Sequence, residues 1–96
     1  MRDDGFEWDA AKAQSNFAKH GISFAGACRA FDDLFAIERI DTGSPSPEVR
    51  YVHMGMANGV LLTVVYTERG ERIRIISARK ATRYEQREYY RGQTPE

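Results

Sequence analysis

The chain has 96 residues, of which 42% are hydrophobic and 29% charged, and its formal net charge is zero. This length and composition predict one globular domain over residues 1–96 with a single modest core, and they argue against disorder along most of the chain. The longest apolar run, residues 60–66, is far too short to span a membrane, the N-terminal residues lack a signal-peptide core, and one cysteine excludes an internal disulfide. We therefore expect a cytoplasmic protein with no membrane partner.

Two helices are predicted in the first third of the chain. Asp9 is a typical helix N-cap, good helix formers follow it, and Gly21 is suited to end the helix in the left-handed conformation. Ser23 can cap a second helix over residues 24–33, in which apolar residues recur at helical spacing. Cys28 lies on that apolar stripe, so we interpret it as a small core residue and not as a catalytic thiol.

The period then changes to that of β-strands. The stretch "LFAIERI" ends like a strand, "DTGSPSPE" is a loop with two prolines, and "VRYVHMGM" alternates. The turn signal "ANG" precedes "VLLTVVYTE", an almost continuously apolar run that indicates a central strand covered on both faces. "RGE" turns the chain again into the alternating "RIRIIS". We expect these three strands to form an antiparallel meander, with the strand around Ile37 beside them.

A last helix begins with a strong signal. Thr82 and Glu85 have the spacing of a capping box, and the helix is expected to reach Gly92, after which residues 92–96 should fray. Near the start of the chain, Phe6 and Trp8 alternate with polar residues and predict a brief strand or an apolar contact. The order of elements predicts an α+β fold, with an antiparallel meander of about three to four strands, two N-terminal helices and a C-terminal helix.

Charge is unevenly distributed along this neutral chain. Residues 1–48 carry nine acids and five bases, whereas residues 69–91 carry eight bases and three acids. Such segregation predicts one basic face, as contact with a phosphate backbone requires. The alternative is a C-terminal helix with a solvated, arginine-rich surface.

Most of these bases belong to the stretch "RIRIISARK" and to the helix after it. Alternation places two arginines on the strand face opposite the isoleucines, two further bases follow just after the strand, and two arginines spaced by four share a face of the helix. In chain order these residues are Arg72, Arg74, Arg79, Lys80, Arg83 and Arg87. Planar guanidinium groups suit a phosphodiester. Pairing of Arg72 or Arg74 with Glu68, Glu71 or an acid of a neighbouring strand is the alternative.

These residue types favour RNA cleavage without a metal or nucleotide. The chain has no paired acids at metal-site spacing, no His/Cys cluster and no phosphate-binding glycine loop, so we expect no metal site and no cofactor. RNA can be cut by its own 2′-OH, provided that side chains move protons and stabilise the charge on phosphorus. The side chains able to move protons are His20, Lys19, Glu68, Tyr66 and Tyr84, with His53 as the competitor of His20. Equally, Lys19 and His20 could merely end a helix, where positive charge is favourable.

Several blocks of the sequence also match a known pattern in the right order. "FEWDAAKAQSNFAKHGISF", "AFDD" and "YTERGERIRIISARKATRYEQREYY" together resemble the BrnT family of small toxins, from Phe6 to about Tyr90. The resemblance implies a compact RelE-like fold, ribonuclease activity that arrests translation, and neutralisation by a cognate BrnA-type antitoxin. RNA would be the substrate, and DNA would be reached only through the antitoxin, which carries a DNA-binding domain. Residues 41–59, which include His53, depart most from the shared pattern.

The resemblance carries over to individual residues of two blocks. Lys19 and His20 match the Lys-His-Gly block, and the arginine block is matched by Arg72, Arg74, Arg79 and Lys80. We expect His20 or Lys19 to transfer protons, and the three arginines to bind phosphate and stabilise the charge of the transition state. Further contacts to RNA are expected from Lys80, Arg83, Arg87 and Glu68. Two other interpretations stay open at this point: a non-catalytic binding module, and an inactive toxin that serves as partner of a DNA-binding repressor.

Overall fold

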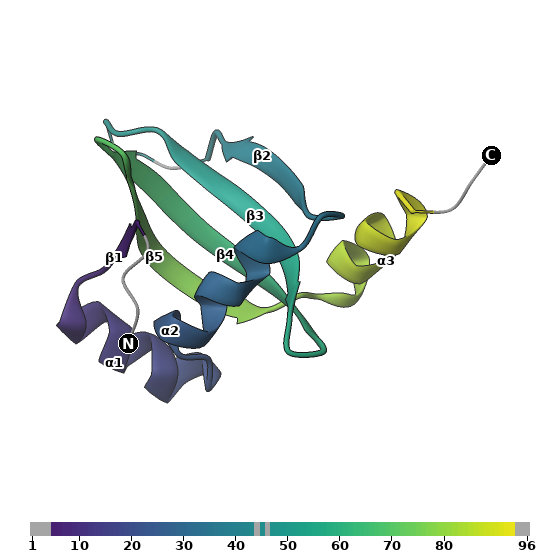
Figure 1. Cartoon of the computed structure of the whole chain (residues 1–96), viewed down its shortest axis with the longest axis horizontal. Coiled ribbons are helices and arrows are strands. Elements are labelled where there is room, and N and C mark those ends of the chain that lie inside the picture. The colour runs from purple at the N-terminus through teal and green to yellow at the C-terminus, as the bar shows by residue number, and fades with distance from the viewer. Residues whose placement is uncertain (1–4, 44, 46, 94–96) are drawn as a thin grey trace.

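A five-stranded sheet forms the centre of the molecule (Figure 1). The computed structural model describes residues 5–43, 45 and 47–93. The strands lie in the order β1-β5-β4-β3-β2, and they are β1 (Phe6–Glu7), β2 (Ile37–Asp41), β3 (Arg50–Ala57), β4 (Val60–Arg69) and β5 (Arg72–Lys80). The helices are α1 (Ala10–His20), α2 (Phe24–Ala27), the 3₁₀ helix η1 (Cys28–Asp32) and α3 (Arg83–Arg91). The predicted α+β class is confirmed.

The predicted meander is present in β3, β4 and β5, and β2 pairs with β3 as expected. Asn58 and Gly59 join β3 to β4, both with positive φ (51° and 83°), which is the conformation that a two-residue hairpin turn needs. Gly70, with φ 61°, turns the chain between β4 and β5. Most of β4 is buried, because both faces of this central strand are covered.

The prediction of a purely antiparallel sheet of three to four strands is wrong in one respect. The short strand β1 adds a fifth strand, and it runs parallel to β5, with Phe6 opposite Ile73 and Glu7 opposite Arg74. The Ile73 N–H donates to the Gly5 carbonyl at 2.7 Å. The brief strand predicted near Phe6 is therefore present, but its partner and direction depend on contacts with residues distant in the chain.

The first helix is as predicted, but the second is not. The Asp9 carboxylate caps α1, and Gly21 ends it with φ 74°. In place of one helix over residues 24–33, the four-residue α2 leads into η1, which packs against β3. A Cβ on Gly55 of β3 would lie 2.3 Å from the Ala30 carbonyl oxygen, so glycine is what allows η1 to lie this close. The contact between η1 and β3 thus decides the local structure, although the helical spacing of apolar residues favoured one continuous α-helix.

The two faces of the sheet have different surroundings. On the core face, defined by Leu62, Val64 and Ile75, the helices α2 and η1 cross in front of the strands and bury Phe24 (Figure 1). Arg72, Arg74 and Arg79 lie on the opposite face, which we call the arginine face, because Arg74 and Arg79 stand opposite Thr67 and Thr63 of β4 and not opposite the core residues. Helix α3 covers one end of the arginine face.

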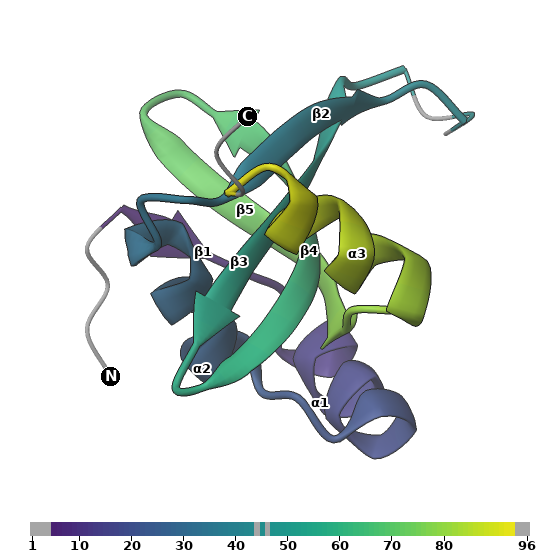
Figure 2. The same cartoon turned by 90° about the vertical axis from the view of Figure 1, so that its right-hand side faces the viewer.

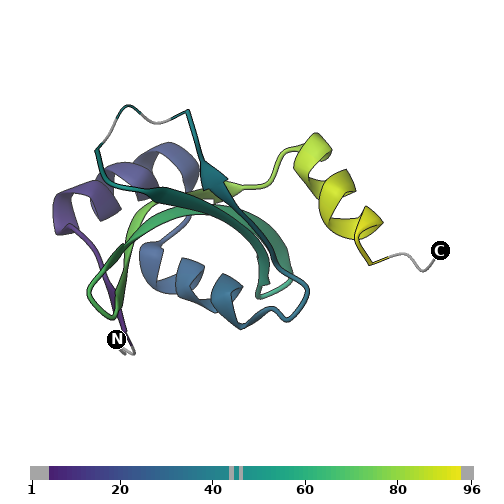
Figure 3. The same ribbon diagram turned by 90° about the horizontal axis from the view of Figure 1, so that it is seen from above.

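Helix α3 stands apart from α1 and α2, at the other end of the molecule (Figure 3), and lies across the strands when viewed from that end (Figure 2). Its Thr82–Glu85 capping box is formed as predicted. Tyr89 packs beside Leu61 and Ala81, and its hydroxyl donates to the Asp33 carboxylate. The predicted fraying of residues 92–96 lies partly outside the described residues. Within them, the Gly92 N–H still donates to the Glu88 carbonyl.

Candidate functional site

Arg72 and Arg74 are both held by one carboxylate. Arg72 Nε donates to Glu7 Oε1 at 3.1 Å, and Arg74 donates to Glu7 Oε2 at 2.8 Å. A second nitrogen of Arg72 donates to the Phe6 carbonyl at 2.6 Å. Hydrogen bonding and charge from Arg74, more than from Arg72, hold the pKa of the Glu7 carboxyl below its ordinary value, although burial acts in the opposite direction. The sequence left open that Arg72 or Arg74 pairs with an acid of a neighbouring strand. The structure shows this arrangement, with Glu7 of β1 as the acid.

Two further arginines join this end of the arginine face. Arg69 stands opposite Arg72, and Arg50 stands opposite Thr67, so the side chains share a face. Both lie 3.7 Å from carboxylate oxygens of Glu48. The sequence did not single out Arg50 and Arg69, because their position depends on the register of the two hairpins. The four arginines and their two glutamates form what we call the arginine cluster.

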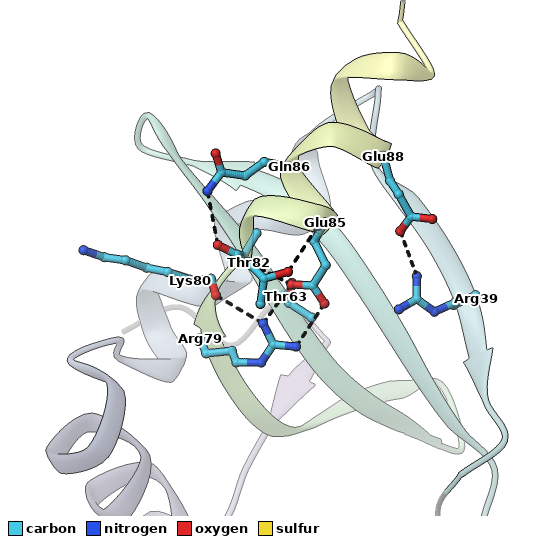
Figure 4. A network of polar contacts seen from close by, with 9 residues as sticks. Arg39, Thr63, Arg79, Lys80, Thr82, Glu85, Gln86 and Glu88 are labelled. Carbon is cyan, nitrogen blue, oxygen red and sulfur yellow. Dashed lines mark hydrogen bonds and ion pairs between the residues drawn. The ribbon is translucent and has the colours of Figure 1, made fainter.

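Arg79 has a different environment at the far end of β5 (Figure 4). The prediction that Arg79 follows the strand is wrong, because the residue lies within β5. Its two terminal nitrogens donate to Glu85 at 2.8 and 3.0 Å. Glu85 is almost fully buried and also accepts from the Thr63 hydroxyl and the Thr82 N–H. The hydrogen bonds from Arg79, more than those from Thr82 and Thr63, lower the pKa of Glu85 to about 2, against the effect of burial. The ion pair of Arg79 with Glu85 therefore links the first turn of α3 to β5.

Asn16 brings the end of α1 to the same end of β5. Its side-chain amide is buried, donates to the Ala78 carbonyl at 2.8 Å and to the Ile22 carbonyl at 3.1 Å, and accepts from the Ala78 N–H at 3.1 Å. The amide thus replaces the strand partner that β5 lacks there, since β1 pairs only with Ile73 and Arg74. No local pattern distinguishes Asn16, because its main partner, Ala78, is 62 residues away in the chain.

Lys19 and His20 form the last turn of α1, one turn beyond Asn16, and both are exposed. Lys80 ends β5 and is also exposed, and its side chain extends away from the Arg79–Glu85 pair (Figure 4). Arg83 begins α3 three residues later. These four bases belong to the three elements that Asn16 and the short link from β5 to α3 join near the C-terminal end of β5, and we call them the terminal basic group.

We expect Asn16→Ala to lower the free energy of unfolding by about 2–4 kcal/mol, because it leaves Ala78 and Ile22 with unpaired backbone groups. Thermal or urea unfolding measures the change. Ser15→Ala, at the neighbouring exposed position of α1, is the matched control and should change stability by less than about 0.5 kcal/mol. An Asn16→Ala protein as stable as the Ser15→Ala protein would contradict the role given to this amide.

The alternating pattern of its strand allowed His53 to be a surface residue, but the structure shows that it is not. It is buried, stacks on Phe31 with ring centroids 4.2 Å apart, and places its two ring nitrogens 2.9 Å from Glu38 Oε2 and 2.8 Å from the Ala30 carbonyl oxygen. Tyr66 donates to the same Glu38 oxygen at 2.6 Å. Burial, and next this hydrogen bond, raise the pKa of the Tyr66 hydroxyl. His53 and Tyr66 thus link η1 to the sheet on the core face, away from the arginine cluster.

The other predicted residues lie at separate places. Glu68 is exposed near the end of β4 and pairs in register with Ile73. Tyr84 is exposed on α3, whereas Arg83 and Arg87 line its outer side, which faces away from the sheet. The structure therefore divides the predicted site into four parts: the arginine cluster, the Arg79–Glu85 pair, the terminal basic group and the outer side of α3.

Within the described ranges, no three His, Cys, Asp or Glu side chains are grouped closely enough to hold a metal ion. Across the same residues, none of the helices has both the length and the apolar composition needed to span a bilayer.

The fold and these surfaces define a small α+β protein with several separate groups of basic side chains. A family model for the ribonuclease toxin BrnT of type II toxin–antitoxin systems matches residues 8–85. The chain therefore belongs to the BrnT family, which makes it a ribonuclease toxin whose partner is an antitoxin protein. No curated protein matches it.

Proposed function

We propose that the chain is a RelE-like endoribonuclease of the cytoplasm, which cleaves RNA without a metal ion, arrests translation and is neutralised by a BrnA-type antitoxin. Membership of the BrnT family supports the ribonuclease activity and the antitoxin partner. The order of elements, with a short strand, two helices, a meander and a last helix, is compatible with a RelE-like fold.

The terminal basic group is the part of the molecule to which we assign catalysis. The observation that carries this assignment is the anchoring of Asn16 on Ala78, because it holds the last turn of α1 beside the end of β5. Arg74 and Lys80 are about 20 Å apart along an extended strand, and Arg74 is bonded to Glu7. One phosphate cannot contact both ends, so the arginine cluster would bind a flanking part of the RNA.

The chemistry requires proton transfer and charge stabilisation at one phosphate. The RNA 2′-oxygen attacks phosphorus while its proton is removed, and the bond from phosphorus to the 5′-oxygen breaks as that oxygen gains a proton. The products are a 2′,3′-cyclic phosphate and a 5′-hydroxyl. His20 is the proposed proton-transfer residue, with Lys19 as its neighbour, while Lys80 and Arg83 stabilise the additional negative charge on the phosphate oxygens.

Arg79 has a supporting role in this proposal. Both of its terminal nitrogens are bonded to Glu85, so it supplies little net charge to a substrate as long as the pair persists. It acts instead through the position of Arg83, because the pair fixes the start of α3.

Incubation of the purified protein with RNA in excess EDTA tests the proposal. We expect cleavage to 2′,3′-cyclic phosphate ends, detected by gel electrophoresis and mass spectrometry. A DNA strand of the same sequence is the control, and it should stay intact because it has no 2′-OH. Cleavage that needs a divalent metal, or cleavage of the DNA, would contradict the mechanism. Binding of RNA by the folded protein without cleavage would instead favour a non-catalytic module.

A further inference from the structure

The outer side of α3 carries a shallow hollow of about 520 Å³. It is lined by Arg83, Gln86, Arg87, Tyr90 and Arg91. These residues face away from the sheet because Glu85 and Tyr89 are buried against it on the opposite side of the helix. The hollow is therefore separate from the arginine cluster.

Acidic side chains do not neutralise this surface within the part of the chain that the structure describes. The two glutamates of α3 both turn toward the sheet, where Glu85 pairs with Arg79, and Glu88 lies 3.8 Å from Arg39. Arg83, Arg87 and Arg91 take part in none of the ion pairs between described residues. Three positive charges thus line one side of a nine-residue helix.

A second hollow on the molecule has the opposite chemistry. It lies between α1 and α2 and has a volume of about 400 Å³. Among the described residues no charged side chain lines it, and Trp8, Phe17 and Phe24 contribute its aromatic surface. An apolar hollow suits a protein side chain, whereas arginines beside a tyrosine suit a nucleic acid strand. Tyr90 is half exposed, and its ring packs edge-on against that of Tyr89, which limits its movement.

We propose that the outer side of α3 binds the backbone of single-stranded RNA next to the bond that is cut, an inference that rests on the function proposed above. Arg83 belongs to both the terminal basic group and this hollow, so a strand leaving the catalytic end of β5 meets α3 directly. Arg83, Arg87 and Arg91 follow at intervals of about 6 Å along the helix. Consecutive phosphates of one strand contact them, and a base stacks on Tyr90.

Binding of a fluorescent, uncleavable 2′-O-methyl RNA, followed by anisotropy at several salt concentrations, tests this surface. We expect Arg87→Gln to weaken binding and to reduce the slope of log affinity against log salt by about 0.7, the value for one lost phosphate contact on a single strand. Lys12→Gln is the matched control, because it removes one exposed positive charge from α1 on another part of the molecule. The control should leave the affinity within about twofold and the slope unchanged.

A cleavage assay separates binding from chemistry. With a 20-nucleotide RNA, Arg87→Gln should raise KM and leave kcat unchanged, whereas with a four-nucleotide RNA the variant and the wild type should behave alike. Equal effects of Arg87→Gln and Lys12→Gln on 2′-O-methyl RNA would overturn the proposal. It would also be overturned if Arg87→Gln weakened binding of the antitoxin and left RNA binding intact. If the wild type failed to cleave RNA, the proposed function would fall, and the binding assay would still decide the role of α3.

Discussion

Replacing His20 with glutamine should lower the rate of RNA cleavage by about 10²–10⁴-fold, the usual contribution of a general acid or base. The reason is that glutamine keeps a polar side chain of similar size but cannot exchange a proton near neutral pH. His20 is exposed in the last turn of α1, so the fold does not depend on its packing. The rate is measured as kcat/KM on a defined RNA in EDTA.

The alternative explanation of His20 predicts a different result. If Lys19 and His20 serve only as positive charges at a helix C-terminus, His20→Gln should cost at most about 1 kcal/mol of stability and leave cleavage unchanged. Melting of each variant and the cleavage assay therefore distinguish the two explanations. Lys12→Gln, in the first turn of the same helix, is the control for a general effect of charge on RNA encounter. Equal cleavage by His20→Gln and the wild type would remove His20 from the mechanism.

Local signals in the sequence predicted the helix caps and the turns. The caps at Asp9, Ser23 and Thr82 are each formed by side-chain contacts within three residues, and Gly21 adopts the expected positive φ. A cap or a tight turn depends on a few neighbouring residues, and it is therefore readable from a short window. The alternation in β5 is also a local signal, and it correctly placed Arg72 and Arg74 on the face of the strand opposite to that of Ile73 and Ile75.

The partners of the functional residues were not predictable in the same way. Glu7 is 65 residues from Arg72, and Asn16 is 62 residues from Ala78, so their contacts follow from the topology of the sheet. His53 shows the same limit, because its burial depends on the approach of η1 to Gly55. Alternation assigns a residue to a face, but it does not say what covers that face.

Arg74 and Arg79 both make structural contacts, so their variants can lose activity for structural reasons. Loss of activity in Arg74→Ala would come with loss of a contact to Glu7, and loss in Arg79→Ala with loss of the anchor of α3. Activity alone therefore cannot separate a phosphate ligand from a structural arginine. Protein stability and its dependence on pH provide the distinction, and we expect the largest effect at the pair of Arg79 with the buried Glu85.

Removal of Arg79 should lower the free energy of unfolding by about 2–3 kcal/mol, because it leaves the buried Glu85 carboxylate without its charged partner, whose own side chain is partly exposed. We expect Arg79→Met with Glu85→Gln to be less destabilising than the sum of the two single changes, since neither variant side chain is left as an unpaired charge. Arg39→Met is the matched control: this arginine also reaches α3, through Glu88 at 3.8 Å, but it is half exposed. The control should cost less than about 1 kcal/mol.

Lowering the pH should reduce the free energy of unfolding of the wild type more than that of the Glu85→Gln variant. The pKa of Glu85 is about 2 in the folded protein and has its ordinary value of 4.5 in the unfolded chain, so below pH 4.5 the unfolded chain binds a proton that the folded protein does not. The pair therefore contributes its stability fully above pH 4.5, and this contribution is lost as the pH falls toward 2. Glu7, Asp33 and Glu38 also have lowered pKa values, which the comparison with Glu85→Gln cancels.

Urea unfolding at pH 7, 4 and 3 measures this difference. The stability of the wild type should exceed that of Glu85→Gln by about 3 kcal/mol at pH 7, and the gap should narrow progressively below pH 4.5. A constant gap would mean that Glu85 stabilises α3 through its shape and neutral hydrogen bonds to Thr82 and Thr63, and not through its charge. In that case Arg79 would be free to act on RNA, and its removal should reduce cleavage with little loss of stability.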